Sequence, residues 1–220
     1  SPENDLVGRE VAPIPCALQE KPLGTGDATK AARELLKDFS GDIIILFGDT
    51  PLITQKSLQS LRDTRAATGA SIVVAGFTPK DPSGYGRLIM DASGHLTQIV
   101  EDMDTTPEQK KINLCNGGIM LFEASKLWPL LDKLNNNNAK AEYYLTDCVK
   151  LAREQGLSTA VADFPEEDIM GVNTRVDLAQ AEKIMQNRLR RQAMVNGVTF
   201  VDPETVYLSH DTVFGSDVIV

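Results

Sequence analysis

"IIILFGDTPLI" (residues 43–53) is the stretch that decides the fold, because it joins a continuous apolar run to a carboxylate. A short apolar run of this kind is typical of a strand that is buried on both faces of a parallel sheet. Asp49 follows the run directly, and ligands of open α/β sheets bind beyond the carboxyl ends of the strands. Asp49 is therefore either the cap of a following helix or an oxygen ligand for Mg²⁺, and the stretch alone leaves both open.

On either side of this strand, apolar runs alternate with segments of helical periodicity. Strands are predicted at 42–48, 70–78, 116–124 and 158–164, with a hairpin at 85–102 whose turn lies at 91–94. Helices are predicted at 27–39, 54–69, 125–134 (capped by Ser125), 142–156 and, long and charged, at 175–197. This alternation predicts the α/β class, with a Rossmann-like, mostly parallel sheet.

The pattern changes after the last helix. "VYLSHD" (206–211) and "TVFGSD" (212–217) share a frame of six residues. Repeats of this length build parallel β-helices, although a plain hairpin would show the same pattern. We expect the first coil of a β-helix that has been cut off, because a β-helix needs several stacked coils to bury its core.

Charge and composition exclude several classes of function. The chain has 220 residues, with 22 Lys and Arg against 31 Asp and Glu, so its net charge is −9. A nucleic-acid-binding face requires a basic patch, and no apolar run approaches the roughly 20 residues of a membrane span. We therefore expect no nucleic acid and no membrane partner. With only His95 and His210, a His-based triad or zinc site is not expected.

The three cysteines, Cys16, Cys115 and Cys148, are odd in number and match no zinc spacing. Each neighbours apolar residues, so buried free thiols are predicted. Free thiols indicate a reducing cytoplasm.

Two segments carry candidates for binding a nucleotide. "LGTGDA" (23–28) opens a predicted helix, and its glycines, Gly24 and Gly26, leave the backbone beside Thr25 open to close approach. Gln19 precedes this loop and can hydrogen-bond a base edge. A plain Gly-rich turn is the alternative.

Four further residues each have two possible roles, one in local structure and one in binding a ligand. Gly86 belongs to a tight turn or contacts a sugar through its backbone. Glu101 ends a strand or accepts hydrogen bonds from sugar hydroxyls. Asn116 forms a turn or offers an amide to a ligand, and Asn173 caps a helix or offers an oxygen to a metal.

The order of these motifs is more specific than any one of them. Together, "LGTGDA", "FGDTPLI", "PSGYGRL", "IVED", "NGGI", "EYYLTD" and "GVNTR" resemble one family, from about Gln19 to the end of the chain. That family is the bacterial bifunctional N-acetylglucosamine-1-phosphate uridylyltransferase / glucosamine-1-phosphate acetyltransferase, and the resemblance is to its uridylyltransferase part. The hexads lie where the left-handed β-helix of this family begins.

The resemblance implies a reaction and a set of roles. UTP and N-acetylglucosamine-1-phosphate would give UDP-N-acetylglucosamine and pyrophosphate, for peptidoglycan and lipopolysaccharide synthesis. Uridine would be held by Gln19, Gly24 and Thr25, the sugar by Gly86, Glu101 and Asn116, and Mg²⁺ by Asp49 and Asn173. No catalytic residue is implied beyond metal binding and substrate positioning.

The resemblance also implies a division of the chain and a larger assembly. Residues 1–174 would be the nucleotidyltransferase domain, 175–196 a linker helix, and 197–220 the start of the left-handed β-helix. The intact enzyme would be a homotrimer that also acetylates glucosamine-1-phosphate with acetyl-CoA on later coils.

Two features depart from the family pattern. The family's first strand and its loop of the type "LAAGxGTRM", followed by a lysine, have no counterpart here, and Asp102 to Asp104 stand where a basic residue is common. The alternatives are therefore a non-catalytic fragment that binds a UDP-sugar, or a related sugar nucleotidyltransferase for another base.

Overall fold

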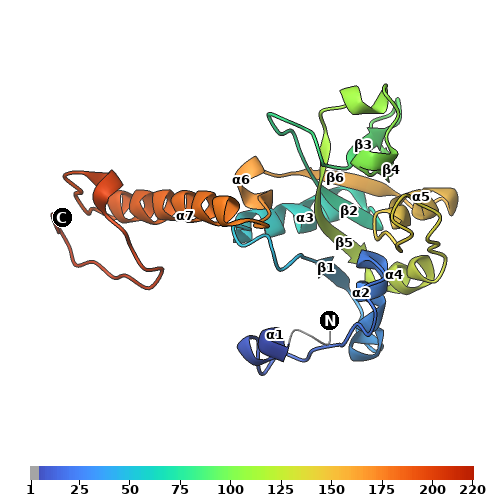
Figure 1. Ribbon diagram of the computed structural model, residues 1–220, viewed down its shortest axis with the longest axis horizontal. Coiled ribbons are helices and arrows are strands. Elements are labelled where there is room, and N and C mark those ends of the chain that lie inside the picture. The colour runs from blue at the N-terminus through green and yellow to red at the C-terminus, as the bar shows by residue number, and fades with distance from the viewer. Residues whose placement is uncertain (1–4) are drawn as a thin grey trace. The chain divides into compact units, whose positions relative to one another are not determined.

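The computed structural model describes residues 5–220, which form two compact units (Figure 1). The first unit contains the described residues up to Phe47 together with Gln55–Glu166, and the second contains Gly48–Thr54 together with Glu167–Val220. The helices of the first unit are α1 (Asp5–Glu10), α2 (Thr25–Ala31), α3 (Gln55–Thr68), α4 (Ala124–Leu131) and α5 (Asp147–Glu154). Its strands are β1 (Asp42–Ile45), β2 (Ile72–Phe77), β3 (Arg87–Met90), β4 (Leu96–Val100), β5 (Cys115–Glu123) and β6 (Thr159–Asp163).

The sheet of the first unit is mixed, so the prediction of a mostly parallel sheet was wrong. Its order is β4-β3-β5-β2-β6, and β1 also pairs with β5. β5 is antiparallel to β1, β2 and β3, and only β2 and β6 form a parallel pair. The direction reverses at the hairpin between β3 and β4, and β5 keeps the direction of β4, because both strands are antiparallel to β3. The connection from β4 to β5 contains two short 3₁₀ turns, η2 (Asp102–Asp104) and η3 (Gln109–Lys111).

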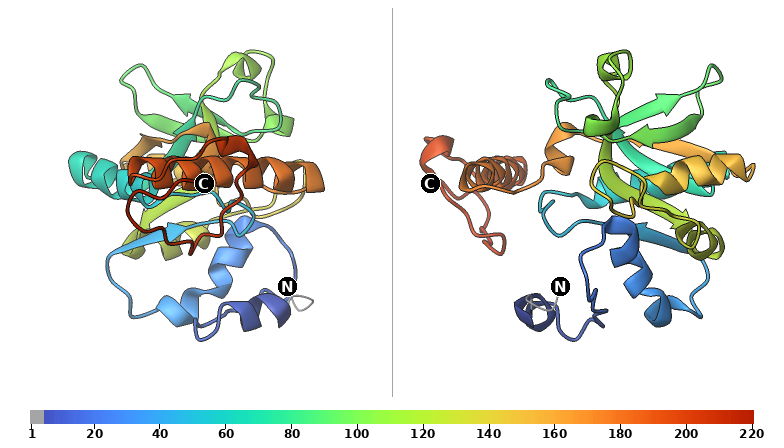
Figure 2. Two further views of the ribbon diagram at one scale, coloured as in Figure 1. Left: turned by 90° about the vertical axis from the view of Figure 1, so that its left-hand side faces the viewer. Right: turned by 45° about the vertical axis from the view of Figure 1, so that its right-hand side comes forward.

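β1 is an edge strand that is only half-buried, whereas its sequence predicted burial on both faces. Among the described residues it pairs with β5 alone, from Asp42 opposite Glu123 to Ile45 opposite Met120 (Figure 2). β1 nevertheless has the same direction as β2 and β6, because β1 and β2 are both antiparallel to β5. The expectation that Asp49 follows the carboxyl end of a sheet strand therefore holds.

The core of the first unit lies between the sheet and the pair α4 and α5, which Figure 1 shows together on one side of β2 and β5. Successive β2 side chains alternate between faces, so Ile72 and Val74 belong to this core while Val73 faces the other way. Cys115 and Cys148 are buried, as predicted, but Cys16 is exposed, so that prediction was wrong for Cys16.

Several helix boundaries differ from the prediction, and the helix predicted at 125–134 ends at Leu131. The helix predicted at 27–39 ends at Ala31 and gives way to the 3₁₀ turn η1 (Arg33–Leu36). The helix predicted at 142–156 begins only at Asp147. α4 is capped by Glu123 rather than Ser125, whose hydroxyl donates to the Glu123 carboxylate. The predicted hairpin at 85–102 is confirmed by β3 and β4.

The second unit is built around α7 (Arg175–Val195), in the region where a long helix was predicted. The helix α6 (Glu166–Ile169) precedes α7, and the 3₁₀ turn η4 (Pro203–Thr205) follows it. Beyond α7, one parallel bridge joins Thr199 to Ile219, and the first coil of a β-helix stays a prediction. No helix within residues 5–220 combines the length and the apolar character that a membrane crossing requires.

Candidate functional site

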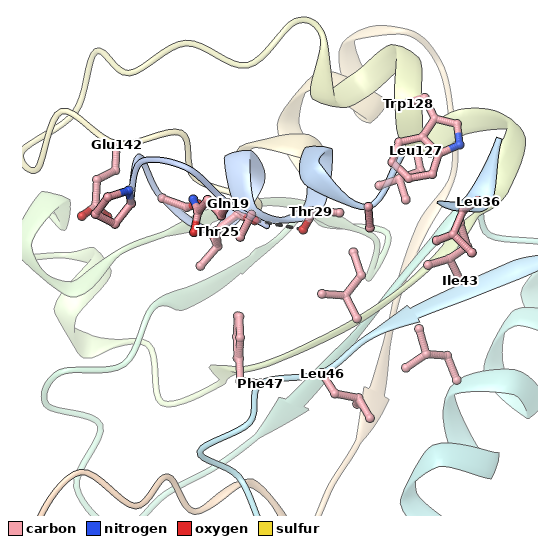
Figure 3. Close-up of a pocket in the computed structure, with 16 residues that line it drawn as sticks. Gln19, Thr25, Thr29, Leu36, Ile43, Leu46, Phe47, Leu127, Trp128 and Glu142 are labelled. Carbon is pink, nitrogen blue, oxygen red and sulfur yellow. Dashed lines mark hydrogen bonds between the residues drawn. The ribbon is translucent and has the colours of Figure 1, made fainter. Parts of the chain in front are cut away.

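The three residues predicted to hold a nucleotide line one cavity of about 590 Å³ in the first unit. Gln19 and Thr25 lie on the α2 side of this cavity, and Phe47 lies opposite them (Figure 3). Gly24, the N-cap residue of α2, also lines the cavity. The rest of the wall is largely apolar and comes from α2, β1 and α4. The structure thus brings the three predicted residues together at one end of an apolar cavity.

Gly24 has a structural reason to be glycine that is independent of any ligand. Its φ of +113° is rare for L side chains, and a Cβ there would lie 2.7 Å from the Tyr143 carbonyl oxygen. Gly26 donates its N–H to the same oxygen at 2.8 Å, and the N–H of Tyr143 donates to Leu23 at 2.8 Å. The Gly-rich loop is therefore packed against the backbone of residue 143, which also explains why helix α5 starts late.

The three residues predicted to hold a sugar also lie together. The N–H of Asn116 donates to the carbonyl of Gly86 at 2.7 Å. A Cβ on Gly86 would lie 3.3 Å from Oε2 of Glu101, so a side chain here would press on the carboxylate. The Asn116 side-chain oxygen accepts the N–H of Gly118 at 3.0 Å. A carboxylate and an amide thus flank a glycine backbone on three neighbouring segments.

The segment before α5 connects the two groups. Thr25 Oγ1 accepts the N–H of Leu145 at 3.0 Å, and the next residue, Thr146, donates its hydroxyl to Oε1 of Glu101 at 2.9 Å. Sequence reasoning missed Thr146, because "EYYLTD" reads equally well as a capped helix start with core aromatics. One peptide thereby fixes the nucleotide-side loop relative to Glu101.

The surroundings of Glu101 are acidic. Burial raises the pKa of Asp147, and the charges of Glu101 and Asp104 raise it further. Burial likewise raises the pKa of Tyr144, with Asp104 and Glu101 adding to the shift. Such an environment favours hydroxyl and N–H donors over phosphate groups.

Asp102, the residue after Glu101, has a cationic partner. It forms an ion pair with Arg87 at 3.2 Å, and the Arg87 side chain is only 3% exposed. The Arg87 guanidinium also donates to the carbonyl of Tyr85. The residue after Gly86 is therefore tied to the residue after Glu101, which holds the two sugar-side segments together.

The predicted metal ligands, Asp49 and Asn173, belong to the second unit and are exposed. The N–H of Val172 donates to the carbonyl of Asp49 at 2.8 Å, so the two loops are joined. Neither residue is a helix cap, because α3 begins only at Gln55 and the N-cap of α7 is Thr174. No cluster of three or more His, Cys, Asp or Glu suited to a metal occurs within residues 5–220. A carboxylate with an amide oxygen suits Mg²⁺, which takes few protein ligands and completes its shell with phosphates and water.

These features define a class of protein: an α/β domain with an apolar cavity beside a Gly-rich loop, and with a carboxylate and an amide on neighbouring segments. A comparison with family models makes the class definite, since residues 6–169 match the nucleotidyl transferase family. The chain belongs to this family.

Similar proteins in several bacteria carry the name bifunctional protein GlmU. The chain is 46% identical over 220 residues to that of Paramagnetospirillum magneticum, covering 100% of this chain and 49% of the relative. It is 48% identical over 218 residues to that of Rhodospirillum rubrum, covering 99% and 49%. The match to that of Brucella anthropi is 46% over 214 residues, covering 97% and 47%. The chain spans about half the length of these relatives.

Proposed function

We propose that this chain is the uridylyl-transfer part of a longer protein. The phosphate of N-acetylglucosamine-1-phosphate attacks the α-phosphorus of UTP, the bond to the β-phosphate breaks, and UDP-N-acetylglucosamine and pyrophosphate result. The observation that carries the proposal is the hydrogen-bonded path from Thr25 through residues 145 and 146 to Glu101. This path sets a nucleotide-side group and a sugar-side group at a fixed separation, as joining two substrates requires.

The roles of the sugar-side residues follow from their chemistry. Glu101 retains acceptor capacity beyond its bond to Thr146 and receives hydroxyl or N–H donors of the sugar. Gly86, which has no side chain, lets the sugar approach the backbone beside that carboxylate. Asn116 supplies an amide on the neighbouring strand.

Asp49 and Asn173 are proposed to hold Mg²⁺, which neutralises phosphate charge when bound. The protein then needs no side-chain nucleophile, because phosphoryl-type transfer depends on positioning and charge neutralisation. Gln19, Gly24 and Thr25 hold the uridine end.

The wider assignments belong to the same proposal. A homotrimer, acetylation of glucosamine-1-phosphate with acetyl-CoA, and the start of a left-handed β-helix at 197–220 are expected of the longer protein. The division at 1–174 and 175–196 and a cytoplasmic location are proposed with them.

Calorimetric titration of this chain with UDP-N-acetylglucosamine and Mg²⁺ tests the proposal, with UDP and UDP-glucose as comparison ligands. We expect selective binding of the N-acetylated sugar nucleotide. Glu101→Gln should weaken the binding of UDP-N-acetylglucosamine by about tenfold, since a hydrogen bond to a charged acceptor is lost. The binding of UDP should weaken much less. Glu108→Gln, an exposed change of the same kind, should alter neither affinity. Absence of binding by the unsubstituted chain, or equal losses for both ligands in Glu101→Gln, would count against the proposal.

A further inference from the structure

The side-chain amide of Gln19 uses its N–H donors within the protein. Nε2 donates to Oδ2 of Asp27 at 2.8 Å and to the carbonyl oxygen of Gly24 at 3.3 Å. A primary amide has two N–H donors and one carbonyl acceptor, so both donors are occupied. Within residues 5–220, no hydrogen bond is donated to the amide oxygen of Gln19. That oxygen is the group left to receive a ligand.

The orientation of this amide follows from its neighbours. An ionised carboxylate and a backbone carbonyl can only accept hydrogen bonds. Turning the amide over would bring its oxygen against Asp27 and Gly24, with three acceptors together and no donor between them. Such a contact leaves polar groups unpaired, at a cost that is larger than the value of one ordinary hydrogen bond. Asp27 therefore holds the amide in one orientation.

Asp27 acts from outside the nucleotide-side cavity. Gln19 lines both that cavity and a neighbouring groove of about 420 Å³, whereas Asp27 lines only the groove. Gln19 lies beside Thr25 on the wall of the cavity (Figure 3). A carboxylate in the groove thus decides which polar atom of Gln19 is available to a base in the cavity.

We propose that Asp27 is a positioning residue that sets base specificity through Gln19. An acceptor in the cavity suits uracil, which presents the N3–H donor between two carbonyl oxygens. It opposes cytosine, whose N3 is an acceptor, so that two acceptors would face each other. The inference rests on the proposed function, because it assumes that a nucleotide base occupies this cavity. It adds a reason why the site takes a uridine rather than a cytidine nucleotide.

The test is a pair of titrations, UTP and CTP in Mg²⁺, on the unsubstituted chain and on Asp27→Asn. The unsubstituted chain should bind UTP at least about tenfold more tightly than CTP, the selectivity of a hydrogen bond replaced by a clash of acceptors. In Asp27→Asn the new amide can donate as well as accept, so only the longer contact with the Gly24 carbonyl, at 3.3 Å, still opposes the turned orientation of Gln19. We expect the UTP-to-CTP preference to fall to within about threefold, chiefly because CTP binds more tightly.

Three further variants separate positioning from general structural effects. Gln19→Ala should lose the preference altogether. Asp27→Glu keeps an acceptor-only carboxylate and should keep the preference, which a purely steric role for Asp27 does not predict. Glu34→Gln removes one charge from an exposed position nearby and should leave the preference unchanged.

An unchanged preference in Asp27→Asn would overturn the inference, as would a preference that survives in Gln19→Ala. Equal binding of UTP and CTP by the unsubstituted chain would also overturn it. That result would leave the proposed function standing if UDP-N-acetylglucosamine still bound selectively. Failure of every uridine nucleotide to bind would instead remove the proposed function, on which the inference depends.

Discussion

The three cysteines differ in exposure, and exposure and pKa together govern thiol reactivity. Cys16 is exposed, whereas Cys115 and Cys148 are buried. Burial raises the pKa of Cys148 to about 12, and the charge of Asp147 acts in the same direction. Burial also raises the pKa of Cys115, partly offset by Arg87. Because the thiolate is the reactive form, both burial and a raised pKa protect Cys115 and Cys148, whereas Cys16 is open to reagents.

Alkylation with iodoacetamide at pH 8 should therefore modify one thiol in the native chain and three after unfolding. Peptide mass analysis should place the native modification at Cys16. Cys16→Ser should abolish the fast reaction and leave the total after unfolding at two. Fast labelling of Cys148 in the folded chain would show that α5 opens readily or that its surroundings are more polar than the structure indicates.

Reciprocal hydrogen bonds between Thr174 and Asp177 close the start of α7. Thr174 accepts the N–H of Asp177 at 3.2 Å, and the Asp177 carboxylate accepts the N–H groups of Thr174 at 2.8 Å and of Asn173 at 3.1 Å. This reciprocal pair is a capping box, which satisfies N–H groups that a helix end otherwise leaves without partners. It also fixes the backbone of Asn173, one of the two proposed Mg²⁺ ligands.

Thr174→Ala should lower the free energy of unfolding of the second unit by about 1 kcal/mol, the usual effect of losing an N-cap side chain. The side-chain hydrogen bond with Thr174 is the largest cause of the lowered pKa of Asp177, ahead of the backbone N–H groups of Thr174 and Asn173, which remain in the variant. A lowered pKa stabilises the fold above the usual carboxyl pKa and is lost as the pH falls through the folded-state value. Acidification below about pH 4 should therefore destabilise the variant less than the unsubstituted chain.

Chemical denaturation at pH 7 and pH 3, followed by helix circular dichroism, measures both effects. Val176→Ala is the matched control, since it changes an exposed residue in the same helical turn and should stay within about 0.5 kcal/mol. If Thr174→Ala lowers the free energy of unfolding equally at both pH values, the effect of the cap is independent of the ionisation of Asp177.

These elements also show which structural features a sequence pattern predicts and which it does not. The start of α7 is readable because Thr174 and Asp177 stand three residues apart before a periodic run. The direction of β5 is not readable, because apolar spacing reports which residues are buried and not which way a strand runs. The half-burial of β1 could not be predicted for a related reason. An edge strand and a central strand can have the same apolar sequence, and only their pairing partners distinguish them.

The candidate site was predictable to a similar extent. Gly86, Glu101 and Asn116 were predicted as turn or strand-end residues that could contact a ligand, and the structure brings them together. Thr146 and Asp27 were missed, since each acts through another side chain rather than through a motif. Their partners lie 45 and 8 residues away in the sequence, and only folding shows the contact.

At the scale of the whole molecule, the chain leaves the first unit after Phe47 and returns to it at Gln55. The second unit therefore depends on contacts between the short stretch Gly48–Thr54, which carries Asp49, and the residues after Glu167. Arg188 contributes to these contacts directly through Leu52 and indirectly through Asp168, which also accepts from Thr54. Its guanidinium donates to the carbonyl of Leu52 at 2.6 Å and to Asp168 at 2.7 Å.

Asp168 makes this contact hard to replace. Its side chain is only 5% exposed, and its second oxygen accepts the hydroxyl of Thr54 at 2.6 Å. Removal of the cation from such a pair takes a charge partner and a hydrogen bond from a buried carboxylate, which costs about 3 kcal/mol or more. The stretch that carries Asp49 should therefore lose its anchor when Arg188 is replaced.

Hydrogen exchange on Arg188→Met tests this dependence. Protection of amides in residues 48–54 and in α7 should fall by about 100-fold, which corresponds to a loss of nearly 3 kcal/mol. Protection of β2 amides should stay unchanged, because β2 lies in the first unit. Arg191→Met removes an exposed arginine from the same helix and should change neither region. Equal loss in β2 would mean that the two units open as one cooperative body, and unchanged protection in 48–54 would mean that other contacts hold the Asp49 stretch.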